Sequence, residues 1–251
     1  MTKQLMIYDN IQPLSDKHRN WTVNVQNFNF VKHLNSVPVL ATEIPMAAAE
    51  FPVIFSATAT AGEYLPLAVL GLKEGQSLFV TQDGRFDSRY VPAFIRRYPF
   101  VLAGDPGAET LAVCLDEDSE AVHKDGSSGK RLFDDNGEQT QHLKDVIEFL
   151  KDYQFRAEMT KSFCAKLHEL NLLEPMQANI TFKDHQESNL NLTGFYVIKR
   201  EKLKEISDEA ALELFKKDGL ELIYAHLQSL NNLNALITKM SSRLAEEKQA
   251  S

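Results

Sequence analysis

The sequence predicts an α+β protein with a β-rich first half and a helical second half that contains a β-hairpin. Residues 1–120 carry short apolar runs separated by turn residues, which is typical of strands. Over much of residues 138–245, apolar residues recur at spacings of three and four, which is typical of helices. Between them, residues 121–137 are rich in Gly, Ser and charged side chains. This stretch predicts an exposed connection between two subdomains.

The first half is expected to form an antiparallel meander with one buried face. Trp21–Val25 alternates with period two, as a half-buried strand does. Asp83-Gly84 and Asp105–Gly107 provide turns between strands. Short apolar runs predict the other strands, at Val53–Phe55, Ala68–Leu70, Ser77–Thr81, Phe100–Ala103 and Leu111–Leu115.

The helical half is expected to begin with one long helix over residues 138–172. Its apolar stripe starts at Leu143 and continues to Leu170, and Pro175 is expected to end it. Two alternating runs within about 178–199, Ala178–Lys183 and Leu192–Lys199, then predict the hairpin.

Two further helices are expected after the hairpin. Ser207 precedes two acids, a pattern that caps a helix and suits its positive N-terminal dipole, so a helix is expected from there to Lys217. A final helix is expected over Leu220–Leu244, and residues 246–251 are expected to form a disordered tail.

Composition restricts the classes of function. The chain has 251 residues and a formal net charge of −8, and no basic stripe offsets that charge. A net negative protein repels the phosphate backbone, so we expect no nucleic-acid binding. No apolar stretch reaches the length of a membrane span, and the N-terminal apolar run is too short for a secretion signal. We expect a cytoplasmic protein without membrane insertion, although leaderless secretion stays open.

The two cysteines, Cys114 and Cys164, have no spacing typical of a metal site. Two buried free thiols are the simpler interpretation. A disulfide between them would suit a periplasmic or secreted protein, and the sequence leaves that alternative open.

The segment Tyr90–Phe100 contains the adjacent pair Arg96 and Arg97 within a frame of Tyr, Pro and Phe. Pro92 suits the first turn of a short helix, and Pro99 disfavours helical geometry at Tyr98. Because guanidinium groups pair with carboxylates and phosphates, one hypothesis is an anion-binding site. Its candidate residues are Arg96, Arg97, His18, Tyr90 and Tyr98. The alternative is that both arginines tie the helix to acidic residues of the fold, with their stems packed on aromatic rings.

A weaker hypothesis is a non-haem iron site. His123 and Asp125, with His185 or His226, match the two histidines and one carboxylate of such oxygenases. His123-Lys-Asp125 opens a Gly/Ser-rich loop, however, and holding metal ligands there costs conformational entropy. We therefore predict no metal and no cofactor, and the sequence identifies no catalytic residue.

Several segments besides Tyr90–Phe100 resemble the SapC family of bacterial proteins. They are Asn35–Val39, Glu50–Phe55, Leu192–Ile198 and the C-terminal run Leu203–Leu233. The resemblance implies a non-enzymatic accessory or binding role in a surface-layer (S-layer), secretion or nutrient-uptake system, with proteins of such a system as partners. It implies no catalytic residues. The alternative is an enzyme of unassigned chemistry with an anion pocket at Arg96 and Arg97.

Overall fold

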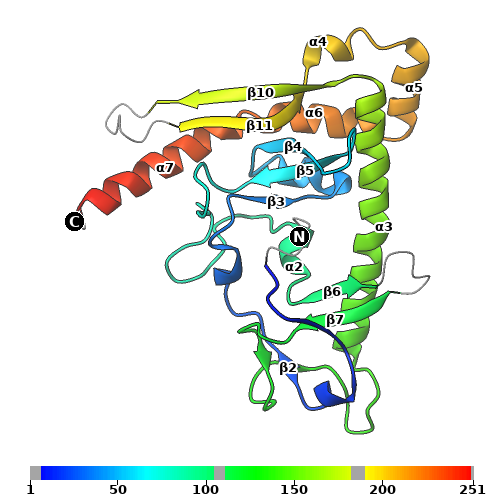
Figure 1. Ribbon diagram of the computed structural model, residues 1–251, viewed down its shortest axis with the longest axis vertical. Helices are drawn as coiled ribbons and strands as arrows, with labels where there is room; N and C mark the ends of the chain where they lie inside the picture. The colour runs from blue at the N-terminus through cyan, green and yellow to red at the C-terminus, as the bar shows by residue number, and fades with distance from the viewer. Residues whose placement is uncertain (1–6, 105–110, 182–189, 250–251) are drawn as a thin grey trace. The chain divides into compact units, whose positions relative to one another are not determined.

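The fold is α+β, as the sequence predicts (Figure 1). The structure, a computed structural model, describes residues 7–104, 111–181 and 190–249. Every strand pairing within these residues is antiparallel. Within the same ranges, none of the helices combines the length and apolar character needed to cross a membrane. The predicted turn Asp105–Gly107 lies outside the described residues.

The chain divides into two compact units, and each unit joins two separate stretches of sequence. Unit 1 is Met1–Phe30 with Ala93–Phe155, and unit 2 is Val31–Pro92 with Arg156–Ser251. This division differs from the expected split into 1–120 and 138–245. The reason is that helix α3 (Gln141–Glu169) contributes residues to both units.

Unit 1 contains two small sheets. One has the order β1-β7-β6, and the other has the order β8-β2-β9. The bounds are β1 (Ile11–Pro13), β2 (Thr22–Val23), β6 (Phe100–Ala103), β7 (Ala112–Asp116), β8 (Val122–His123) and β9 (Lys130–Arg131). The short helices are η2 (Asp16–His18), η3 (Asn29–Val31, which continues into unit 2) and α2 (Ala93–Arg96). Its core consists of Val23, Phe100, Leu115, Ala121, Leu132, Leu143 and Leu150.

Residues 121–137 are largely exposed, as their composition predicts, but they also contain two short strands. β8 and β9 pair with the two sides of β2, and Leu132 is fully buried. Gly129 has a φ of 100°, and a Cβ there would lie 2.4 Å from the carbonyl oxygen of Val23. The glycine is therefore required for close approach of the backbones, not for flexibility.

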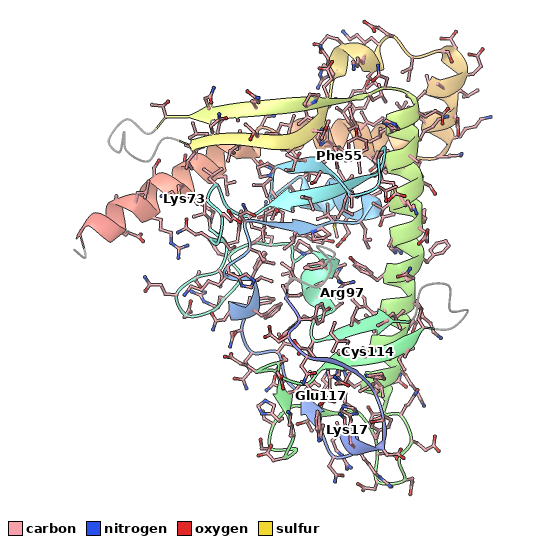
Figure 2. All side chains as sticks on the ribbon, viewed as in Figure 1. Lys17, Phe55, Lys73, Arg97, Cys114 and Glu117 are labelled. Carbon is pink, nitrogen blue, oxygen red and sulfur yellow. The ribbon has the colours of Figure 1, made fainter. Side chains whose placement is uncertain are left out.

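Unit 2 contains a five-stranded sheet with the order β10-β11-β4-β5-β3. The bounds are β3 (Ser36–Pro38), β4 (Val53–Ala57), β5 (Tyr64–Val69), β10 (Leu173–Ile180) and β11 (Leu190–Ile198). The hairpin β10–β11 joins the sheet through the pairing of Tyr196 with Phe55. Phe55, labelled in Figure 2, is fully buried and belongs to the hydrophobic core of unit 2. The hairpin is thus joined to β4 by the cross-strand pairing of two aromatic residues.

The remaining helices of unit 2 are η4 (Ala41–Glu43), α1 (Ile44–Ala47), α4 (Arg200–Leu203), α5 (Asp208–Lys216), α6 (Gly219–Ser229) and α7 (Asn232–Gln249). α6 contacts α1, α5, β4 and β11 (Figure 1). The prediction of one helix over Leu220–Leu244 is wrong, because the chain breaks between α6 and α7. The Asn232 side-chain amide donates to the carbonyls of Ala48, at 2.7 Å, and Phe51, at 3.1 Å. These bonds fix the break against α1.

Three other local predictions need correction. Ser77–Thr81 forms no strand but only one isolated bridge, between Val80 and Phe86. The Phe79 amide donates to the Ser77 hydroxyl, at 3.2 Å, instead of pairing with a neighbouring strand. The long helix ends at Glu169, before Pro175, which lies within β10. α7 continues to Gln249, past the expected start of disorder at residue 246, and residues 250–251 lie outside the described part of the chain.

Ser207 caps α5 as predicted, because its side chain accepts a hydrogen bond from the Ala210 amide at 3.2 Å. We expect Ser207→Ala to lower the free energy of unfolding by about 1 kcal/mol. Ser162→Ala, on the exposed face of α3, is the control and should cause no loss. Urea unfolding followed by circular dichroism measures both, and equal stability of the two variants would contradict the capping role.

Candidate functional site

Arg97 is almost fully buried, with a relative exposure of 5%. Its guanidinium carbon lies 4.7 Å from the ring centroid of Phe94, 4.7 Å from that of Tyr153 and 5.7 Å from that of Tyr8. Arg96 is exposed and lies 5.2 Å from the ring centroid of Phe149. The adjacent arginines therefore have different surroundings, and Arg97 sits within a cage of three aromatic rings.

Tyr8 completes this cage from the N-terminal segment. Its hydroxyl donates to the carbonyl of Phe100, at 2.8 Å. Burial raises the pKa of Tyr8 well above its ordinary value, and the nearby charge of Arg97 opposes that rise. Tyr8 therefore stays neutral and presents its ring to Arg97.

His18 is fully buried and is held through both ring nitrogens. Nδ1 accepts from the backbone amide of Ser15, at 3.0 Å, and Nε2 lies 2.9 Å from the Glu117 carboxylate. Lys17 lies 2.5 Å from the same carboxylate, and Figure 2 shows Lys17 and Glu117 together. Burial would raise the pKa of Glu117, but the bonds from Lys17 and His18 outweigh it and hold the pKa below its ordinary value.

The Ser15 hydroxyl lies 3.4 Å from Nδ1 of His18, so Ser15, His18 and Glu117 have the residue types of a catalytic triad. The Nδ1 lone pair, however, already accepts the Ser15 backbone amide, as in the first turn of a capped helix. The arrangement therefore orders the β1–β2 connection around Trp21, whose ring meets His18 edge-on at 4.5 Å.

Tyr90 belongs to unit 2, whereas the other four candidate residues belong to unit 1. Its hydroxyl donates to the carboxylate of Glu43, which also accepts the Leu40 amide at 3.0 Å. Glu43 is buried and belongs to unit 2, as Tyr90 does. The Tyr90 hydroxyl therefore has its hydrogen-bond partner within its own unit.

Of the five anion-site candidates, Tyr98 lines a pocket in the described part of unit 1, and His123 of the iron hypothesis lines it too. The pocket has a volume of about 480 Å³, within the usual range for small-ligand sites. The Tyr98 ring stacks on Phe30 with a centroid distance of 4.0 Å. Burial raises the pKa of Tyr98 to about 12, and the negative charges of Asp116 and Asp9 act in the same direction. The phenol is therefore neutral.

The other pocket residues come from two segments, 24–30 and 118–123, with Asp9 from the N-terminal segment. They provide the carboxylates of Asp9, Asp118 and Glu120, four side-chain amides and the ring of His123. The amides belong to Asn24, Gln26, Asn27 and Asn29. Among the described residues that line the pocket, there is no lysine or arginine. The pocket is therefore acidic and rich in hydrogen-bonding groups.

Asp116 does not line this pocket, but it bonds to the backbone of Asp9, which does. Its carboxylate is fully buried and accepts the backbone amides of Asp9, at 3.1 Å, and Asn10, at 2.9 Å. These bonds join the N-terminal segment to the end of β7. The acidic run 116–120 is thus partly internal, although such runs are typical of exposed turns.

The described residues do not bring together the ligands that the iron hypothesis requires. Asp125 is exposed and accepts the Ser127 amide, at 3.0 Å, while His123 belongs to β8. His226 lies in unit 2, fully buried, where its Nε2 accepts the Ile198 amide at 3.0 Å. His185 lies outside the described residues. Within the described ranges, no three His, Cys, Asp or Glu side chains gather to form a metal site.

Both cysteines are buried free thiols. Cys114 belongs to unit 1 and Cys164 to unit 2. Burial raises the pKa of both thiols, that of Cys164 to about 12. Neither thiol is activated as a nucleophile, which agrees with the simpler interpretation of the sequence.

Comparison with known proteins supports the resemblance found in the sequence. The family model for SapC matches residues 14–236 of the 251 in the chain. Searches of curated proteins and of solved structures find no match. Because the family match covers most of the sequence and both units, the chain belongs to the SapC family.

Proposed function

We propose that this chain is a binding protein, not an enzyme, and that it takes a small polar ligand in the pocket of unit 1. The single observation that carries the proposal is the pocket itself, with acidic, amide and aromatic side chains around a volume of about 480 Å³. A few placed polar groups beside an aromatic wall are what orient a small ligand.

Two further observations agree with this proposal. The residues that sequence reasoning associated with chemistry have structural partners: His18 is bonded to Ser15 and Glu117, and Arg97 lies against three rings. Membership of the SapC family supports an accessory role in a bacterial surface-layer, secretion or nutrient-uptake system, acting with proteins of that system. The pocket would supply the ligand-dependent part of that role.

The test is a thermal-shift screen of the purified protein against sugars, sugar acids, amino acids and amines, followed by calorimetry of any compound that stabilises it. Gln26→Ala should weaken binding, because Gln26 lines the pocket and is exposed. Gln139→Ala is the matched control, since Gln139 is an exposed glutamine of unit 1 outside the pocket.

Two outcomes would contradict the proposal. One is a stabilising compound whose affinity is the same in wild type and in Gln26→Ala. The other is consumption of the bound compound on incubation, which would show an enzyme. For the accessory role, deletion of the gene in its host should reduce surface-layer, secreted or imported material, and the wild-type gene should restore it more fully than Gln26→Ala.

A further inference from the structure

We propose that the ligand of the unit 1 pocket is a small polyhydroxylated amine, a sugar-sized molecule with one positive charge. This inference rests on the proposed function and specifies its ligand. The proposed ligand is a cation, whereas the arginine pair suggests an anion. The difference arises because acidic residues line the pocket, whereas the Tyr90–Phe100 segment carries two arginines.

The charge argument comes from the carboxylates. Asp9, Asp118 and Glu120 line the pocket, and the described lining residues include no basic side chain apart from His123. Lys124, which does not line the pocket, pairs with Asp118, and its Nζ is 3.8 Å from the Asp118 carboxylate. Three acidic residues that line one cavity, with so weak a counter-charge, attract a cation and repel an anion.

The backbone amides near the pocket strengthen this preference for a cation over an anion. Anion sites commonly use consecutive backbone N–H groups, and here those of Asp9 and Asn10 already bond to the buried Asp116 carboxylate. Asp116 also places a carboxylate next to the lining residue Asp9. The raised pKa of Tyr98, to which Asp116 and Asp9 contribute after burial, agrees with a negative local potential.

The aromatic wall suits the same ligand. Phe30 and Tyr98 stack at 4.0 Å with an interplanar angle of 17°, and both line the pocket. Aromatic faces attract cations and also pack against the apolar face of a ring. The wall therefore offers a contact surface that a compact, strongly hydrated inorganic ion would not use.

The side-chain amides that line the pocket can form hydrogen bonds with the hydroxyl groups of a ligand. The Asn27 side-chain oxygen accepts the Asn29 amide, at 3.0 Å, and Asn24 donates to the Ser128 hydroxyl, at 3.0 Å. These bonds fix the 24–29 segment while the side chains of Gln26 and Asn29 still line the cavity. An amide both donates and accepts, so such a set matches hydroxyl groups, which do the same.

The test is a calorimetric titration with three probes that share one sugar ring and differ in charge: glucosamine, glucose and glucuronate. We expect glucosamine to bind most tightly and glucuronate least. Glu120→Gln should weaken glucosamine binding roughly tenfold and leave glucose binding nearly unchanged. Glu138→Gln, an exposed glutamate of unit 1 outside the pocket, is the matched control. Unchanged thermal midpoints verify that both variants fold.

Each other outcome overturns the inference in a recognisable way. Equal affinity for glucose and glucosamine, reduced by Gln26→Ala, identifies a neutral-sugar site, and the proposed function survives. Tightest binding of glucuronate, lost in Arg96→Ala, moves the site to the arginine pair. Binding of none of the three probes rejects the amine, and the broader screen then decides the proposed function separately.

Discussion

Arg97→Ala is expected to lower the free energy of unfolding by about 2 to 3 kcal/mol, whereas Arg96→Ala should cost less than about 1 kcal/mol. The two residues are adjacent and chemically identical, but Arg97 is 5% exposed against the rings of Phe94, Tyr153 and Tyr8. Removing its side chain leaves a cavity and ends all three ring contacts.

Urea unfolding followed by the fluorescence of Trp21 measures this difference. The chain has one tryptophan, and it belongs to unit 1, as both arginines do. Arg96→Ala is the matched control. The structural role of Arg97 is wrong if the two variants are equally stable, or if phosphate stabilises the wild type and that effect disappears in Arg97→Ala.

The second large effect is a loss of stability in acid that depends on His226. Burial lowers the pKa of His226 from 6.5 to about 4, and the nearby backbone of Val53 acts in the opposite direction. The unfolded chain therefore takes up a proton below about pH 6.5 that the folded chain does not take until about pH 4. The contribution of neutral His226 to the free energy of unfolding is complete above about pH 6.5. It is lost progressively as the pH falls to about 4, by about 3 kcal/mol in total.

Comparing the pH dependence of urea unfolding in wild type and in His226→Gln isolates this contribution. Burial also lowers the pKa of His142, so the wild type alone does not assign the slope. Glutamine does not titrate and can still accept the Ile198 amide, so its curve should be flatter across the same pH interval. Parallel curves for the two proteins would show that His226 does not carry the effect.

The sequence predicted the elements whose signals are local. β6, β7, the hairpin and α5 appear where alternation and capping placed them, because these signals act over a few residues. The two-unit organisation was not predictable in this way, since residues 1–30 associate with 93–155 through long-range pairings such as that of Ile11 with Asp116. The break between α6 and α7 likewise depends on a distant contact, that of Asn232 with Ala48 and Phe51.

The candidate site was predictable only in part. Tyr98 was named as an anion-site candidate and His123 as an iron-ligand candidate, and both line the pocket, but the rest of the segments 24–30 and 118–123 was missed. Their signals were the run of Asn and Gln after Trp21–Val23 and the acids that follow Cys114, both of which are also typical of solvated loops. What separates a loop from a pocket wall here is the bonding of Asp116 to the amides of Asp9 and Asn10, which lie far away in sequence.

Backbone-amide NMR of the isotope-labelled protein, titrated with glucosamine, tests the central claim most directly. The account predicts shift changes concentrated at residues 24–30 and 118–123 and at Asp9, with glucuronate causing none there. Changes centred on Arg96, or confined to unit 2, would contradict an acidic binding pocket in unit 1.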